Sequence, residues 1–506
     1  MSEVTLNVAL LLLSAAVCLM VFTGKRRRRL PNPPGPFPLP LIGNLNLVSP
    51  RLHHTFHMLA QRYGPIMKFR LGSIPCLVVS TPELAKDILK THELIFSSRV
   101  KSTAIDIVTY GVSFAFSPYG PYWKYIKKLC TYELLGSRML NHFEPLRALE
   151  VREFLKDVMA MGKAGKSFNV TEELMKLTSN VMSNMMLSIR AAESEEQAEV
   201  ARTLIREVSQ LFGEFDFGDM LWFCKSFDFQ GIKKRSKDIK VRYDALLEKI
   251  LTDRENVRRQ NGVVEPKDML DMFLDIMEGG KTDVEFTREH LKAVILDFLT
   301  AGTDTTAITV EWVLAELMNS PKAMKKAQDE MDRVVGRERM MAESDAPNLP
   351  YFLAIIKETF RLHPPIPLII RRSIEDCVID GYHIPADTLA FINVWSMGRN
   401  EKYWDSPLSF RPERFLEGDN AAIDIKGMHF ELLPFGSGRR GCPGMLSAIQ
   451  EVLIIAGTVI QCFDWEQADG SGRVDMSERP GLTTPREIDL VCRVVPRVDE
   501  RVISGH

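Results

Sequence analysis

One short segment constrains this chain more than any other. Residues 435–444 read FGSGRRGCPG and place a single cysteine, Cys442, in a glycine-rich turn. The glycines closest to it are Gly438, Gly441 and Gly444. Because glycine has no side chain, a planar macrocycle could approach the main chain here, and backbone amides could donate hydrogen bonds to the sulfur. The neighbouring Arg439 and Arg440 favour thiolate over thiol. The turn is therefore suited to ligate iron, although an isolated cysteine is more often a buried structural residue.

The spacing within this turn fixes five residue identities in ten positions, which makes chance a poor explanation. They are Phe435, Gly438, Arg440, Cys442 and Gly444. The pattern resembles the haem-binding loop of the cytochrome P450 family. The resemblance implies haem b, iron protoporphyrin IX, as the cofactor, with Cys442 as the iron ligand and Phe435 beside it. Arg440 is then the natural partner of a haem propionate, through charge-assisted hydrogen bonds.

The composition is compatible with a large globular enzyme. The chain has 506 residues, of which 45% are hydrophobic and 26% charged, enough to bury a large core. A formal net charge of −2 argues against nucleic acid as a partner. The eight cysteines lack the CxxC pairs of zinc sites and the pattern of a disulfide framework, so they indicate a reducing compartment.

The N-terminal sequence predicts a membrane anchor. Residues 4–23 are almost wholly apolar, and the basic run KRRRR follows at residues 25–29. About twenty such residues span a bilayer, and the positive-inside rule places the remainder in the cytosol. The proline-rich residues 31–40 predict a stiff, extended spacer. We expect a single-pass anchor in the endoplasmic reticulum membrane at residues 1–24, a basic and proline-rich hinge at 25–40, and a catalytic domain at 41–506.

Hydrophobic periodicity predicts a mainly α-helical fold with small β-sheets. Residues 65–81 alternate and are rich in β-forming residues, which indicates a small sheet. After residue 120, long amphipathic stretches predominate and end at glycine or proline. The predicted ends are Gly136, Gly162, Gly213, Gly262, Gly279 and Pro321. This organisation agrees with the cytochrome P450 fold, a helix-rich haem-thiolate domain, behind an N-terminal transmembrane helix.

A long helix is predicted from about residue 287 to residue 320, roughly 50 Å at 1.5 Å per residue. Its centre reads AGTDTT, and hydroxyls beside an acid are unusual in the middle of a buried helix. We expect Gly302 to let a flat group or O2 lie against the backbone, and a hydroxyl to open a local bulge. The family resemblance implies that Thr305 and Asp304 deliver protons to the activated oxygen. A threonine-rich kink without catalytic purpose is the alternative for this motif alone.

A third motif, Glu358-Thr359-Phe360-Arg361, places an acid and a base on one helical face. Surface ion pairs share this spacing, but FRPERF at residues 410–415 matches a second family element and supplies Arg414. The resemblance implies that Glu358, Arg361 and Arg414 form a structural network that supports folding and haem retention.

Further residues are assigned to the haem by the same resemblance. Trp123 and Lys127 match the family's pattern, although lysine stands where arginine is more frequent. Either Arg371 or Arg372 could bind the second propionate. The sequence does not distinguish them, and we take Arg372 as a provisional choice.

A basic surface is also predicted on the cysteine side of the domain. Lys124, Lys128 and Arg439 would attract an acidic partner, NADPH-cytochrome P450 reductase. The alternative is an ordinary solvated helix face.

The substrate pocket is expected to be apolar and aromatic, which suits a planar ligand. By analogy, its lining would be Phe114, Phe116, Leu299, Ala301, Thr303, Leu368, Ile369 and Thr483. Ordinary core packing is the alternative for any one of these. The segments HPPIPLIIRRSIEDC and ERPGLTTPR resemble plant flavonoid-oxidising members of the family, with flavone synthase II the nearest in kind.

The resemblance implies a membrane-bound monooxygenase that uses O2 and NADPH-derived electrons. We expect it to oxidise flavanones at carbon 2 to flavones, with 2-hydroxylation or isoflavone-type aryl migration as alternatives. Hydroperoxide rearrangement without O2 is disfavoured by Asp304, Thr305 and the uninterrupted cysteine turn. A non-enzymatic haem carrier or membrane scaffold remains the alternative from another class.

Overall fold

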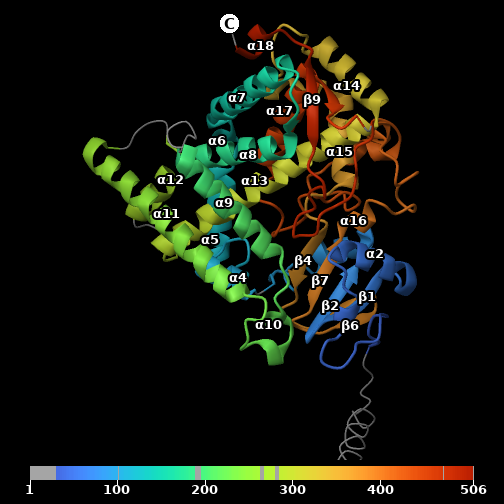
Figure 1. Cartoon of the computed structure of the whole chain (residues 1–506). Coiled ribbons are helices and arrows are strands. Elements are labelled where there is room, and N and C mark those ends of the chain that lie inside the picture. Colours follow the sequence, from blue (N-terminus) through green and yellow to red (C-terminus); the bar gives the residue numbers. More distant parts are fainter. Residues whose placement is uncertain are drawn as a thin grey trace, which may run out of the picture.

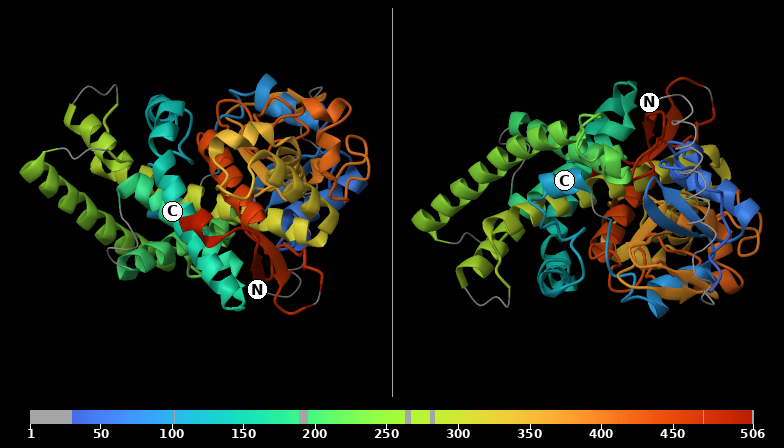
Figure 2. Two further views of the ribbon diagram at one scale, coloured as in Figure 1. Left: turned by 90° about the horizontal axis from the view of Figure 1, so that it is seen from above. Right: turned by 90° about the horizontal axis from the view of Figure 1, so that it is seen from below.

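The computed structural model describes residues 30–100, 102–188, 195–262, 267–279, 284–470 and 472–504. The expected anchor at residues 1–24 and the basic run at 25–29 lie outside these described residues. Figure 1 shows helices gathered on one side of the molecule and the largest sheet on the other. The views from above and below in Figure 2 show the same division.

The structure is mainly α-helical, as predicted. The helices are α2 (Leu52–Tyr63), α3 (Pro82–Lys86), α4 (Thr103–Val108), α5 (Pro121–Leu129), α6 (Ser137–His142), α7 (Glu144–Lys163), α8 (Val170–Leu187), α9 (Glu195–Gly213), α10 (Phe217–Met220), α11 (Ile232–Asn261), α12 (Met269–Gly279), α13 (Arg288–Asn319), α14 (Pro321–Val334), α15 (Pro350–Leu362), α16 (Val394–Met397), α17 (Met445–Cys462) and α18 (Glu500–Ser504). The predicted helix ends are confirmed to within two residues. Gly136 lies two residues after a π-helical turn, Cys130–Leu134, that extends α5, and it also precedes α6.

Helix α13 crosses the centre of the helical side (Figure 1). Its predicted bounds are confirmed, because Thr287 caps its first turn by accepting a hydrogen bond from the His290 amide, and it ends before Pro321. Helix α8 packs along it. A Cβ at Gly302 would lie 2.6 Å from the Met182 sulfur of α8. The expectation that Gly302 faces a flat ligand is therefore wrong, since this glycine allows close contact between two helices.

The largest sheet has the order β1-β2-β7-β4, and all of its pairs are antiparallel except β2 with β7. Its strands are β1 (Ile66–Leu71), β2 (Ile74–Val79), β7 (Leu389–Asn393) and β4 (Leu368–Arg372). The predicted strands within residues 65–81 are thus confirmed as a hairpin. Two smaller sheets contain β3 (Phe168–Asn169), β9 (Val491–Pro496) and β8 (Phe463–Gln467), and β5 (Cys377–Ile379) with β6 (Tyr382–Ile384).

The proline-rich segment lies against β1 of the largest sheet and β6 of the β5-β6 sheet. The Lys68 amide donates to the Pro34 carbonyl at 2.8 Å, and the His383 amide donates to the Pro31 carbonyl at 3.0 Å. A Cβ at Gly35 would lie 2.1 Å from the Lys68 carbonyl oxygen, so only glycine fits beside β1. The segment between the expected anchor and the domain is therefore held by the domain itself.

Two described helices, α13 and α17, are long and apolar enough to cross a membrane. Both are largely buried inside the protein, where they pack against each other. Their composition reflects a core position, and they are distinct from the anchor predicted from the N-terminal sequence.

Candidate functional site

The turn that carries Cys442 is closed by backbone hydrogen bonds. The Cys442 amide donates to the Phe435 carbonyl at 2.9 Å, and the Gly441 amide donates to the Gly438 carbonyl at 2.9 Å. Gly438 has a φ of 72°, and a Cβ there would lie 2.7 Å from the Leu89 carbonyl oxygen. This glycine is therefore required for contact with the neighbouring residues 87–93, rather than to make room for a macrocycle as expected.

The surroundings of Cys442 oppose and favour its thiolate at the same time. Neighbouring protein atoms partly desolvate the sulfur and so raise the pKa of the Cys442 thiol, while the Gly444 amide, Lys127 and Arg99 lower it. Lys127 does not extend toward a separate anion, because its Nζ donates to the Gly441 carbonyl at 3.0 Å. Lysine at this position thus both braces the cysteine turn and brings a positive charge near the sulfur.

Three arginines lie beside the turn: Arg371 and Arg440 are buried, and Arg99 is partly buried. Arg99 donates to the carbonyls of Ile370 at 3.1 Å and Arg440 at 3.3 Å. Arg371 donates to the same two carbonyls, at 3.0 and 3.3 Å. The Arg440 guanidinium donates to the carbonyl of Ser97 at 2.7 Å. Among the described residues, no carboxylate forms an ion pair with any of the three.

This cluster of arginines fits an anionic ligand. Burial lowers the pKa of Arg99 to about 10 and that of Arg440 to about 9, and the neighbouring arginines contribute to the lowering at Arg440. Arg99 Nε and Arg440 Nη1 are buried without a hydrogen-bond partner among the described residues. Uncompensated buried cations are costly, so an anion with two carboxylates, such as the two haem propionates, matches the charge and the free donors.

The structure distinguishes the two arginines that the sequence left open. Arg372, the provisional choice, turns to the surface and pairs with Asp387 at 3.1 Å. Arg371 is buried in the arginine cluster. The assignment of Arg372 is therefore wrong in this geometry, because adjacent residues of β4 point to opposite faces.

Trp123 lies against the same cluster. The Arg440 guanidinium carbon is 4.3 Å from the centroid of the Trp123 ring, a cation–π contact. The Phe114 ring is stacked on the other side of the tryptophan at 6.2 Å between centroids. Trp123 therefore orients Arg440, and Phe114 belongs to this support rather than to an open pocket wall.

Helix α13 is connected to the cysteine turn through α17. Helix α17 begins three residues after Cys442 and packs against α13. Cys442 and Ala301 are both exposed, although most of α13 around Ala301 is buried. Both residues therefore have accessible surface that a flat cofactor could contact.

The hydroxyls of α13 bond to their own helix. Thr305 Oγ1 donates to the Ala301 carbonyl at 2.9 Å, and Thr303 Oγ1 donates to the Leu299 carbonyl at 2.7 Å. The helix nevertheless continues without a break from Arg288 to Asn319, so the expected local bulge is not observed. Thr305 shares the helical face of Ala301, four residues away.

Asp304 is buried against α9. Burial raises the pKa of the Asp304 carboxyl, and Ser209 and Arg206 of α9 oppose this rise. Its Oδ1 has no hydrogen-bond partner among the described residues. Arg206 is exposed, so Asp304 lies between the interior and a charged group at the surface. This is the arrangement that a proton-delivery residue needs.

Glu358, Arg361 and Arg414 are brought together in the core. Arg361 donates to both oxygens of Glu358, at 2.7 and 2.8 Å, and Arg414 Nε donates to Glu358 Oε1 at 3.0 Å. Arg361 also binds the carbonyls of Gly398 and Pro407, which follow β7. All three charged side chains are almost completely buried. The network ties α15 to the loops that follow β7.

The predicted pocket residues do not all face one space. Leu299 lines a small cavity with Tyr243 and Leu247, on the α8 and α11 side of α13. Thr303, four residues on, shares that face, so neither residue lies with Ala301. Leu368 and Ile369 pack into separate hydrophobic clusters on the two sides of the sheet. The prediction that all these residues line one pocket is therefore wrong for Leu299 and Thr303, which face away from Ala301. It is also wrong for Leu368 and Ile369 as a pair, because neighbouring residues of a strand point to opposite faces.

Other residues form a coherent aromatic and loop surface. Phe116 meets Phe212 of α9 edge to face at 5.8 Å between ring centroids. The loop with Thr483 is held because Thr484 donates to the carbonyls of Pro364 and Pro365. Ile366, beside these prolines, is 36% exposed, and the sequence analysis missed it. Arg99 was missed too, since a single arginine after FSS carries no spacing signal.

The predicted basic surface is only partly free. Lys124 and Lys128 of α5 are exposed. Arg439 is exposed as well, but its Nε pairs with Glu93 at 3.0 Å. The surface is therefore less positive than the sequence alone suggests.

Fold and site together define a haem-thiolate protein, with a cysteine beside an arginine cluster and a long central helix in the core. The cytochrome P450 family profile matches residues 33–493. The chain is 53% identical over 492 residues to cytochrome P450 93B2 of Gerbera hybrida, with 96% of each chain covered. It is 43% identical to a 2-hydroxyisoflavanone synthase of Glycyrrhiza uralensis, covering 94% of this chain and 93% of that one.

The solved structure of a zebra fish cytochrome P450 with progesterone superimposes with a TM-score of 0.75 at 26% identity, and covers 89% of this chain and 100% of that chain. The protein belongs to the cytochrome P450 family. It is a monooxygenase with haem as its cofactor, and it uses O2, a reductase partner and a small-molecule substrate.

Proposed function

We propose that this cytochrome P450 oxidises flavanones at carbon 2 to give flavones. The observation that carries the proposal is the kind of substrate named for its relatives. One is a 2-hydroxyisoflavanone synthase at 43% identity, and another is a 3,9-dihydroxypterocarpan 6A-monooxygenase of Glycine max at 44%. The first name gives a hydroxylated isoflavanone as the product, and the second gives a dihydroxypterocarpan as the molecule that is oxidised. Phe116 and Phe212, which pack edge to face and are partly exposed, offer aromatic contacts for such a ring.

The roles of this chain's residues follow from their geometry. Cys442 provides the iron ligand, and Arg99, Arg371 and Arg440 hold the propionates. When bound, haem supplies the activation of O2 and the abstraction of hydrogen from the substrate. Phe435, whose carbonyl closes the cysteine turn, supports the sulfur from the protein side.

Proton supply is the second task of the chain. The Thr305 hydroxyl lies on the accessible face of α13, beside Ala301. Asp304 is turned toward α9 and the surface, where Arg206 is exposed. We assign Thr305 to hold a proton near the reacting oxygen and Asp304 to replace it from solvent.

We further propose a cytosolic catalytic domain on the endoplasmic reticulum membrane, with residues 1–24 as a single-pass anchor. Electrons would come from NADPH through cytochrome P450 reductase, which would dock near Lys124 and Lys128 of α5. The hydrophobic N-terminal sequence and its following basic residues support this orientation.

Aryl migration to an isoflavonoid is the second candidate, favoured by the relative named 2-hydroxyisoflavanone synthase. Simple 2-hydroxylation of a flavanone is the third outcome that one bound pose could give. All three begin with oxidation of the same substrate class, so product identity distinguishes them.

The test is turnover of a flavanone such as naringenin by microsomes that contain this protein, NADPH and a plant reductase. A product two hydrogens lighter than the substrate, with the retention of a flavone, supports the proposal. A 2-hydroxyflavanone or an isoflavone-type product replaces it with the corresponding alternative. No turnover, in a sample whose reduced carbon monoxide spectrum shows an intact haem-thiolate, overturns the substrate class.

A further inference from the structure

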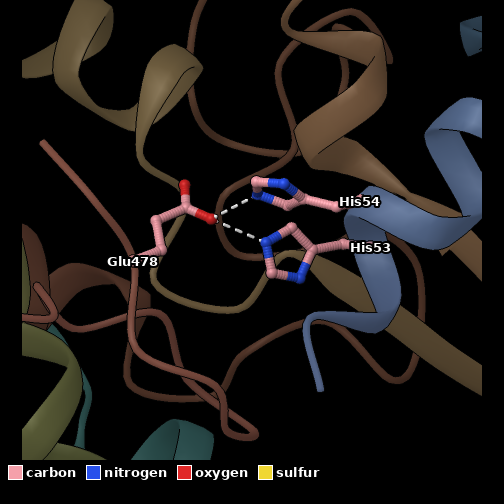
Figure 3. A group of neighbouring side chains, drawn as sticks. All are labelled: His53, His54 and Glu478. Carbon is pink, nitrogen blue, oxygen red and sulfur yellow. Dashed lines mark hydrogen bonds and ion pairs between the residues drawn. The ribbon is translucent and has the colours of Figure 1, made fainter. Parts of the chain in front are cut away.

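Two histidines and one glutamate converge far from the haem site. His53 and His54 are consecutive residues in the first turn of α2, and Glu478 lies in the loop between β8 and β9. Figure 3 shows both imidazoles directed at one carboxylate oxygen. The Nε2 atoms of His53 and His54 are 2.7 and 2.9 Å from Glu478 Oε2. Among the described residues, these three are the group whose potential ligand atoms lie within 4.8 Å of one another.

The second carboxylate oxygen is already bound. Trp395 Nε1 donates to Glu478 Oε1 at 2.8 Å, and Arg399 Nη2 lies 4.0 Å from the same oxygen. Arg399 is itself stacked on the Trp395 ring, 3.8 Å from its centroid. These neighbours therefore orient Glu478 so that Oε2 faces the histidines. Carboxylates that ligate metals are often oriented in this way by hydrogen bonds to residues outside the ligand set.

Both histidines lie in the first turn of α2. Consecutive helical residues point about 100° apart, so their convergence on one oxygen is not a simple result of helix geometry. Two neutral imidazoles and one carboxylate are a common donor set for zinc.

We propose that His53, His54 and Glu478 bind a zinc ion or a similar divalent transition metal. Ligand atoms around tetrahedral zinc lie about 3.3 Å apart for bonds of 2.0–2.1 Å. The two Nε2 atoms therefore need to move about half an ångström away from Glu478 Oε2. His54 is partly exposed, so its movement does not require repacking of the core, whereas His53 is buried and its neighbours must accommodate the shift.

The fourth coordination position opens to solvent. His54 lines a surface hollow of about 400 Å³ together with Arg51, His57 and Trp395. Water or a small anion can reach the metal through it. The positive charge of Arg399 near Oε1 weakens cation binding, so the site is reversible rather than a permanent structural centre.

Metal binding here would tie distant parts of the chain. Glu478 precedes Thr483 by five residues in the loop that docks on Pro364 and Pro365. A metal that links α2 to this loop would stabilise the fold and restrict the loop beside the proposed pocket.

The test uses the full-length holoprotein in detergent, treated with a chelator and titrated calorimetrically with zinc chloride. The wild type is expected to bind one more zinc ion per chain than His54→Ala, which is partly exposed and should fold. His57→Ala, in the same hollow but outside the ligand set, is the matched control and should bind like the wild type. The cysteines are identical in all three proteins, so the difference isolates this site.

A second readout is the unfolding temperature. Zinc should raise it for the wild type and His57→Ala but not for His54→Ala, because a ligand stabilises only the state that binds it. Trp395→Phe should weaken the zinc step by 10–100-fold if it orients Glu478. Equal zinc binding by the wild type and His54→Ala, with no shift in unfolding temperature, would overturn the proposal. The role of His53, His54 and Glu478 would then be to connect α2 to the loop by hydrogen bonds alone.

Discussion

Two groups of largely buried arginines differ in one respect, the presence of a carboxylate. Arg361 and Arg414 share Glu358, which accepts from both at 2.7–3.0 Å. Among the described residues, Arg99, Arg371 and Arg440 bond to backbone carbonyls and to no carboxylate. The first group is complete within the chain, and the second is balanced only by a ligand. Buried charge without a partner in the protein therefore marks where a charged cofactor belongs.

The largest effect is expected where the protein supplies its own counter-charge. Glu358→Gln leaves Arg361 and Arg414 buried without an anion, and breaking a buried pair costs about 3–5 kcal/mol. We expect the variant to accumulate as unfolded or haem-free protein. The measurement is haem content together with the free energy of unfolding. A stable variant with full haem content would show that Glu358 does not carry this network.

In the second group, we expect a substitution to weaken haem retention without lowering the stability of the haem-free protein. Arg371→Leu removes one of three neighbouring cations, and Arg99 still satisfies the carbonyls of Ile370 and Arg440. The haem-free protein should therefore be as stable as the wild type or more so. Haem should dissociate about 10–100-fold faster, because a hydrogen bond to a charged group is worth about 1.5–3 kcal/mol.

The control for this prediction is the adjacent Arg372→Leu. Arg372 pairs with exposed Asp387 at the surface, where such pairs contribute at most about 1 kcal/mol. Haem transfer to apomyoglobin measures dissociation in both variants. If Arg372→Leu releases haem and Arg371→Leu does not, the assignment of the two arginines must be reversed.

The sequence predicts the paired group better than the unpaired one, for a physical reason. Glu358 and Arg361 are one helical turn apart, so spacing alone indicates their contact. The choice between Arg371 and Arg372 depends on which face of β4 turns inward. That face is set by register, in which Arg371 lies opposite Ala390 and Arg372 opposite Leu389 of β7. The apolar run before both arginines has no alternation to reveal it.

The same limit applies to residues brought in by long-range contacts. The cysteine turn and the bounds of α13 were predictable because turn glycines, caps and prolines act locally. Arg99 joins the cluster only through the carbonyls of Ile370 and Arg440, far along the chain. Gly302 faces Met182 because of how α8 crosses α13, which no local pattern of α13 encodes.

A buried carboxyl offers the opposite case to the unpaired arginines. Glu451 of α17 is fully surrounded by protein, and its Oε1 has no hydrogen-bond partner among the described residues. The nearby Arg147 already pairs with Glu343 at 2.7 Å. Burial raises the pKa of Glu451 from 4.5 to about 8, against the opposing charge of Arg147. A surplus carboxyl can lose its charge by binding a proton, whereas a surplus arginine keeps its charge and needs an anion.

The smallest predicted effect is a pH slope that follows from this difference. Between pH 4.5 and about 8, Glu451 is protonated in the folded protein and ionised in the unfolded chain. Its contribution to stability is present below pH 4.5 and is lost as the pH rises toward 8, by at most about 1.4 kcal/mol per pH unit. Glu451→Gln should flatten the stability profile over this window. Urea unfolding at several pH values measures it, and an unchanged slope in the variant would assign the pH dependence to other groups.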